Sequence, residues 1–150
     1  MSTLASSVFD LFMLNVSDYR LISLFQTSGS DTFGAYLQPW LLRSIQKFDI
    51  CDQSLDYNSA SQSFTVDLTQ KNLNILAQLM VEFWMQKEVN DVLQIRQKLQ
   101  DKELKTYSEA QNFTSKQNNL NLIRESNSQM LVEYGIKTNN WTYWKNQVFD

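Results

Sequence analysis

The chain has 150 residues, of which 43% are hydrophobic, and its formal net charge is −3. This length suits one domain with a real apolar core, and the apolar content argues against wholesale disorder. A small negative charge argues against a protein that holds nucleic-acid phosphates, which requires a basic face. A slightly acidic protein is still suited to line a channel through which DNA slides.

Histidine is absent and Cys51 is the one cysteine. The chain therefore lacks the commonest general base and the commonest zinc ligand. A single cysteine cannot form an internal disulfide, and a free thiol fits a reducing compartment, where packing is its expected role. We expect no catalytic site, cofactor or metal. No uncharged run approaches the roughly 18 apolar residues of a membrane-spanning helix, so no membrane role is expected either.

In chain order, residues 3–26 mix helical and irregular signals, and "TSGSD" interrupts them at Gly29. A second helix is predicted from Asp31, a plausible N-cap, with apolar residues at helical spacing up to Phe48. Pro39 lies inside it and removes one backbone hydrogen bond. We therefore expect either a kink or two short helices that meet at Gln38.

The next stretch alternates apolar and polar residues around a turn-like "YNSASQS". It predicts either a short hairpin, with 55–57 paired to 64–66, or an ordered loop. From Thr69 to about Gln100, apolar residues recur at helical spacing, which predicts a helix roughly 45 Å long. Its first half is apolar nearly all round, so we expect burial from more than one side.

A last helix is predicted from Ser108, which forms a capping-box pair with Gln111. Its apolar stripe is thin and is interrupted by Asn127, among others. Gly135, followed by the apolar Ile136, matches the pattern that ends a helix with a left-handed residue. The prediction is therefore a mainly α fold: a helical bundle over residues 1–138 with one long central helix and an extended tail, residues 139–150.

Two acidic features of the sequence are candidate sites. Asp49, Asp52 and Asp56 surround Cys51 but lack the central glycine and terminal glutamate of a calcium loop, so a solvated turn is expected. Glu82 lies on the most apolar helix. We expect it to be exposed or paired with Lys87 or Gln86, although burial would raise its pKa.

The tail "NNWTYWKNQVFD" is rich in aromatic residues. Rings that alternate with polar residues suit an extended segment bound in a groove or at a sheet edge, and aromatic anchors are typical of interface centres. The alternative is that the tail folds back over its own helices. The candidate partner-binding residues are Trp141, Tyr143, Trp144 and Phe149.

The segments "FGAYLQPWLLRSIQKFD" and "LTQKNLNILAQLMVEFWMQKEVNDVLQIRQKLQDKELKTYSEAQNFTSK" resemble the small helical head–tail connector, or neck, proteins of tailed bacteriophages. The resemblance covers roughly residues 31 to 135 and rests on pattern and size.

It implies a structural virion protein, assembled in the host cytoplasm, that forms an oligomeric ring, usually a dodecamer, beneath the portal. Such an adaptor continues the DNA channel without sequence-specific binding and contacts the portal protein and other neck or tail proteins. It also implies that a C-terminal segment leaves the bundle and docks on the portal or a neighbouring subunit. The uncertain hairpin and the first 25 residues leave other neck components open, such as a head-completion or tail-terminator protein. An alternative without the resemblance is a soluble helical regulatory protein that binds a partner as a monomer or dimer.

Overall fold

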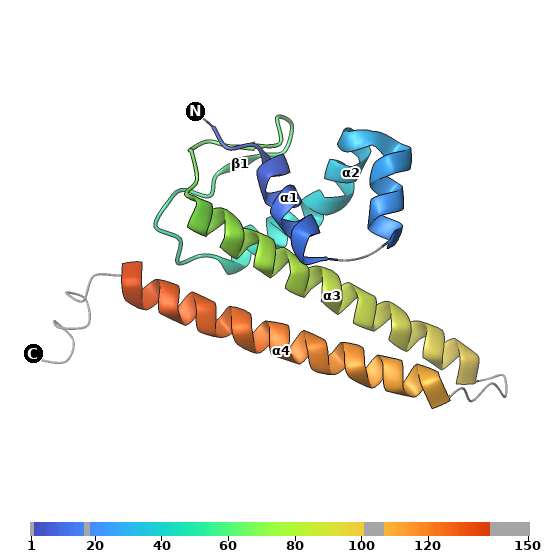
Figure 1. Cartoon of the computed structure of the whole chain (residues 1–150). Coiled ribbons are helices and arrows are strands. Elements are labelled where there is room, and N and C mark those ends of the chain that lie inside the picture. Colours follow the sequence, from blue (N-terminus) through green and yellow to red (C-terminus); the bar gives the residue numbers. More distant parts are fainter. Residues whose placement is uncertain (1, 17–18, 101–106, 139–150) are drawn as a thin grey trace, which may run out of the picture.

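The computed structural model describes residues 2–16, 19–100 and 107–138, and is mostly helical with one short hairpin, as predicted (Figure 1). Residues 139–150 lie outside the described residues, so the predicted extended tail stays a prediction. We call α1, α2 and the connecting residues 48–69 the lobe, and α3 with α4 the arm. The elements are α1 Ala5–Asn15, α2 Tyr19–Lys47, β1 Tyr57–Asn58, β2 Ser63–Phe64, α3 Gln70–Gln100 and α4 Tyr107–Thr138.

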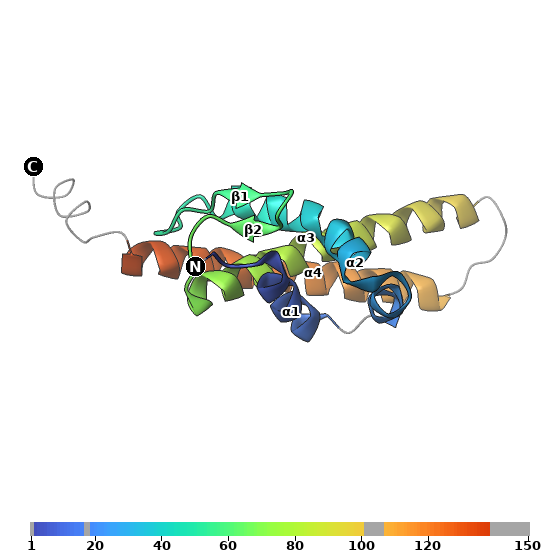
Figure 2. The ribbon, with the colours of Figure 1, turned by 90° about the horizontal axis from the view of Figure 1, so that it is seen from above.

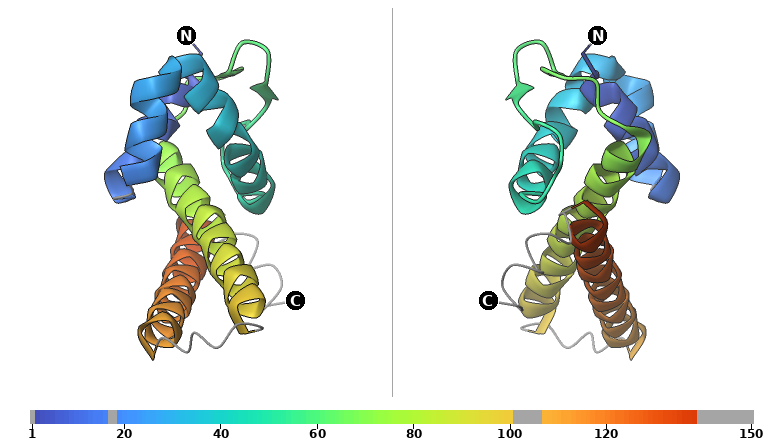
Figure 3. Two further views of the ribbon diagram at one scale, coloured as in Figure 1. Left: turned by 90° about the vertical axis from the view of Figure 1, so that its right-hand side faces the viewer. Right: turned by 90° about the vertical axis from the view of Figure 1, so that its left-hand side faces the viewer.

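In the arm, α3 and α4 lie side by side and run in opposite directions, while the lobe covers the first half of α3 (Figures 1 and 2). The predicted helix from Thr69 to Gln100 is confirmed to within one residue. Its first half contacts α1, α2 and α4, which confirms the expected burial from several sides (Figure 3). Leu76, Leu79 and Met80 are completely buried there. The long helix is thus the shared wall between the lobe and α4.

The hairpin is confirmed, with Tyr57 opposite Phe64 and Asn58 opposite Ser63. The Asn58 side chain accepts a hydrogen bond from the Ala60 amide (2.9 Å), a local contact that favours a turn. The sequence did not suggest that the N-terminal residues add to this hairpin. The Phe64 amide donates to the Thr3 carbonyl (2.8 Å), and the Thr3 hydroxyl accepts from the Leu68 amide (2.8 Å).

The predicted interruption at Gly29 is confirmed. Of the two alternatives expected at Pro39, two short helices that meet at Gln38 are wrong, and a kink there stays a prediction. Gly29 has φ 75° and ψ 172°, the one non-helical conformation inside α2, in a region that only glycine adopts readily. The helix continues through Pro39. The carbonyl that loses its partner there belongs to Ala35, four residues earlier, and both residues are exposed, so water can satisfy it.

The predicted end of the last helix at Gly135 is also wrong, because α4 continues to Thr138. A helical glycine costs about 1 kcal/mol relative to alanine, which packing can offset. The preceding Tyr134 is buried against Phe48, with ring centroids 4.9 Å apart, and this contact holds the last turns on the lobe. The predicted start at Ser108 is correct to within one residue, but the side chains of Ser108 and Gln111 lie outside the described set.

Candidate partner-binding surface

The four aromatic residues predicted to bind a partner, Trp141, Tyr143, Trp144 and Phe149, lie outside the described residues. Their role stays a prediction. In the described part of the chain, the candidate binding surfaces lie on the arm. Two polar clusters, around Glu82 and around the Tyr134 hydroxyl, fix how the helices that form these surfaces pack.

The first cluster surrounds Glu82, and the expectation of exposure or pairing with Lys87 or Gln86 is wrong. The Glu82 side chain is only 7% exposed, and both of its oxygens accept hydrogen bonds from Lys47 Nζ at 2.7 and 2.8 Å. Asn127 Nδ2 donates to Glu82 Oε2 at 2.9 Å and to the Gln78 carbonyl at 3.2 Å. Buried charge is tolerated only with such partners. Glu82 therefore joins α2, α3 and α4 and is not among the residues that line the hollows described below.

The seam between α3 and α4 has a regular seven-residue spacing. Among the α4 side chains that the structure describes, the buried ones are Leu120, Asn127 and Tyr134, and each follows the previous one by seven positions. A seven-residue repeat is the spacing of paired helices that pack along one stripe. Asn127 thus belongs to the packed stripe, where a single polar residue sets the register of two helices.

The second cluster surrounds the Tyr134 hydroxyl at the end of α4. This hydroxyl donates a hydrogen bond to the Asp52 carboxylate and accepts one from the Asp52 amide (3.1 Å). Asn72 Nδ2 donates to Asp52 at 3.0 Å and to Gln53 Oε1 at 2.7 Å. The hydrogen bonds from Tyr134 and then Asn72 lower the pKa of Asp52, whereas burial raises the pKa of Tyr134.

Cys51 belongs to the same cluster and is a packing residue, as expected. It is half-buried against the core, and burial raises the pKa of its thiol. A raised pKa lowers the thiolate fraction, which is the reactive form. Within the described residues, no group of three or more His, Cys, Asp or Glu side chains is placed to hold a metal ion. The Asp49–Asp56 stretch accordingly contributes a structural carboxylate at Asp52.

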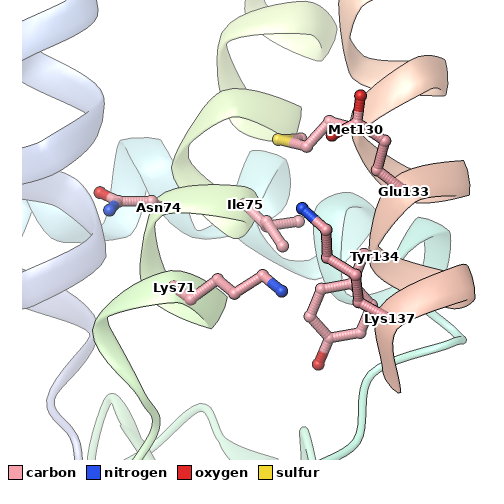
Figure 4. A pocket seen from close by; sticks show the side chains of 7 residues that line it. All are labelled: Lys71, Asn74, Ile75, Met130, Glu133, Tyr134 and Lys137. Carbon is pink, nitrogen blue, oxygen red and sulfur yellow. The ribbon is translucent and has the colours of Figure 1, made fainter. Parts of the chain in front are cut away.

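A first hollow of about 430 Å³ lies between the start of α3 and the end of α4 (Figure 4). The side chains of Lys71 from α3 and Lys137 from α4 extend into the space between the two helices. Lys71 Nζ lies 4.6 Å from the centroid of the Tyr134 ring, a cation–π geometry. Ile75 and Met130 add apolar surface to the wall.

A second hollow of about 570 Å³ lies further along the arm, between α3, α4 and the end of α1. Val81, Trp84, Met85 and Ile123 form most of its apolar wall. Two charged residues also line it, Glu88 from α3 and Lys116 from α4. Gln78 Nε2 donates to Asn15 Oδ1 (3.2 Å), which holds the end of α1 beside it. Both hollows have volumes in the range of ligand pockets, about 300–1,000 Å³.

The face of α4 that points away from α3 carries exposed apolar side chains. Leu122 and Val132 are 64% and 62% exposed, and Ile136 is similar. Amide, hydroxyl and acidic residues separate them along the helix. Such a mixed face, with few charges, has the composition of a protein-binding surface.

Neither family models, curated proteins nor solved structures include a match to this chain. None of the described helices is both long and apolar enough to cross a membrane.

Both hollows were missed from the sequence, because their α3 and α4 residues lie between 28 positions (Glu88 to Lys116) and 66 positions (Lys71 to Lys137) apart and meet only when the two helices pair. One signal was present: the seven-residue spacing of Leu120, Asn127 and Tyr134. It would have indicated the side of α4 that faces α3 and hence the two flanks that remain open.

Proposed function

We propose that this chain is a structural subunit of the neck of a tailed bacteriophage, where copies form a ring between portal and tail around the DNA channel. The observation that carries the proposal is the outer face of α4, where Leu122, Val132 and Ile136 stand exposed on a helix packed along α3. A ring subunit needs a surface for its neighbour in addition to its own core. The resemblance over roughly residues 31 to 135 supplies the assembly context.

Three further features support the proposal. The buried Glu82 accepts hydrogen bonds from Lys47 and Asn127 with both carboxylate oxygens, which gives it a structural role between the helices. The net charge of −3 suits a channel wall that does not hold DNA. The aromatic residues Trp141, Tyr143, Trp144 and Phe149 are proposed to dock on the portal or a neighbouring subunit in the assembled ring.

Co-expression with the portal protein of the same genome, followed by native mass spectrometry and negative-stain imaging, tests this function. The expected result is a ring of this chain on the portal. A protein that remains monomeric or dimeric and forms no portal complex overturns the proposal and favours the regulatory alternative.

The outer face itself is tested by the double variant Leu122→Glu/Val132→Glu. Ring formation should be lost, while the melting temperature of the free subunit is unchanged because both side chains are exposed. The matched variant Gln117→Glu/Ser128→Glu adds the same charge to exposed positions on the flank of α4 and should still assemble. Equal loss of assembly in both variants would show that added charge, rather than the apolar face, is responsible.

A further inference from the structure

The two hollows of the arm lie on one continuous flank. Their α3 residues recur every three or four positions from Lys71 through Gln78 to Glu88. Their α4 residues, from Lys116 to Lys137, follow the same spacing except for one seven-residue step from Ile123 to Met130, between the two hollows. This spacing keeps residues on one side of a helix. Residues of both α3 and α4 line each hollow, so the two stripes face the same side of the arm. The two hollows therefore follow one another along one groove. From Lys71 to Glu88 the groove is about 26 Å long.

The groove has the chemistry of a site for aromatic side chains. Met85 and Met130 lie in its wall, and methionine adapts its shape to aromatic rings. Lys71 already stacks on one ring, that of Tyr134. Lys116 places a positive charge near the far end.

The chain itself supplies an occupant of matching length and composition. After α4 ends at Thr138, beside the first hollow, the sequence continues for 12 residues with four aromatic rings. Twelve residues reach at most about 40 Å, more than the length of the groove. They begin with Asn139 and Asn140, residue types that favour chain reversals.

We propose that, in the free chain, residues 139–150 fold back and bind in the groove of the same molecule. Eight residue steps from Trp141 to Phe149 span about 26 Å when extended, equal to about 18 residues of helix. If Trp141 enters beside Lys137, Phe149 reaches the level of Asn119, and the Asp150 carboxylate comes near Lys116. The negative charge of Asp150 then lies near the positive charge of Lys116.

Binding within one molecule is favoured over binding between molecules in dilute solution. A segment tethered by two residues has an effective concentration in the millimolar range, far above that of other copies at micromolar protein. The inference does not rest on the proposed ring, because it concerns the unassembled chain. The same aromatic residues are free to exchange onto a partner that binds them more tightly.

Disulfide trapping in the full-length protein tests the proposal. In a Cys51→Ser background, Asn119→Cys is combined with Phe149→Cys, and disulfide formation is followed at low micromolar protein by non-reducing electrophoresis and intact mass. The matched control places the helix cysteine at Asn121, also exposed and two residues away, but on the opposite flank of α4. The expected product is a disulfide-bonded monomer that forms at least ten-fold faster in the Asn119 pair than in the Asn121 pair.

A second measurement separates specific binding from simple tethering. Adding Trp141→Ser and Trp144→Ser to the Asn119 pair should slow disulfide formation at least ten-fold, because the anchoring rings are gone. Equal rates for the two pairs, no effect of the serine substitutions, or disulfide-linked dimers as the main product would each overturn the proposal. None of these outcomes depends on whether a portal complex forms.

Discussion

The lobe and the arm are stabilised by different interactions, although both α4 and the lobe pack against α3. In the lobe, α1, α2 and the hairpin bury an apolar cluster that includes Val8, Phe12, Leu37 and Phe64, all completely buried. In the arm, the fully buried side chains among those described on α4 are Leu120, Asn127 and Tyr134, with Ile123, Met130 and Leu131 partly buried beside them. Asn127 and Tyr134 make polar contacts with α3 or the lobe. The packing of apolar side chains thus determines the structure of the lobe, whereas a few hydrogen bonds, spaced along the seam, determine how α4 lies on α3.

This contrast predicts the largest stability loss in the lobe. Phe12 is completely buried and packs edge-to-face on Trp84, with ring centroids 6.3 Å apart. Phe12→Ala should lower the free energy of unfolding by about 3–5 kcal/mol, through lost apolar contact and the cavity left behind. Urea unfolding followed by circular dichroism measures the change. Leu14→Ala, on the same helix but 81% exposed, should change stability by less than about 0.5 kcal/mol, and a similar loss in both would contradict the packing account.

The next effect tests the link between the two regions. Lys47, at the end of α2, forms the shorter of two ion pairs with the buried Glu82, at 2.7 Å compared with 3.9 Å for Arg124. Removing one partner of a buried pair costs about 3–5 kcal/mol, but Lys47 is 30% exposed and water can reach the site, so Lys47→Met should cost about 2 kcal/mol. Chemical denaturation gives the value. Asp91→Asn is the comparison, since it removes the ion pair between Lys87 and Asp91, a surface pair of adjacent helical turns worth about 0.5 kcal/mol. Equal losses of unfolding free energy in the two variants would mean that the burial of Glu82 does not make its ion pair more stabilising.

A smaller loss is expected within the arm at Asn127. Asn127→Ala removes the hydrogen bonds to Glu82 and to the Gln78 carbonyl and should cost about 1–2 kcal/mol. Hydrogen exchange should rise along α4 more than in α1, because the lost contacts belong to the seam. Asn121→Ala, exposed on the same helix, is the control. If protection from hydrogen exchange falls equally in α1 and α4, the hydrogen bonds of Asn127 do not stabilise α4 separately from the rest of the fold.

The regular elements were predictable because their signals are local. The apolar spacing after Thr69, the turn-like residues around Asn58 and the glycine at position 29 each act within a few residues, and the structure confirms all three. The failures arose where distant contacts decide. The end of a helix at Gly135 was overridden by the anchoring of Tyr134 on Phe48, 86 positions earlier.

The candidate surface was less predictable than the fold for the same reason. Glu82 lies 35 positions from Lys47 and 45 from Asn127, so no local pattern could reveal that it is paired. The groove exists only after two helices align antiparallel. Composition predicts that the aromatic tail is a binding segment without knowledge of the fold, and because residues 139–150 lie outside the described residues, this stays a prediction.

The smallest effect concerns the polar anchor of α4 on the lobe. Tyr134→Phe keeps the ring on Phe48 but removes the hydrogen bond to Asp52, so it should cost at most about 1 kcal/mol at neutral pH. Because the fold lowers the pKa of Asp52, its contribution is present above the unfolded pKa of about 4 and is lost as pH falls through the lower, folded value. The stability difference between wild type and Tyr134→Phe should therefore shrink in acid, as measured by urea unfolding across pH.

Tyr57 offers the matched comparison, since its hydroxyl is buried without a hydrogen-bond partner among the described residues. Tyr57→Phe should leave stability unchanged or slightly raised at every pH, because an unsatisfied buried hydroxyl costs free energy. If Tyr134→Phe shows the same small, pH-independent change, the hydroxyl of Tyr134 does not anchor α4. The last turns of the arm would then be held by the packing of the Tyr134 ring on Phe48 alone. Asn127 would be the last residue along α4 at which a polar contact stabilises the seam.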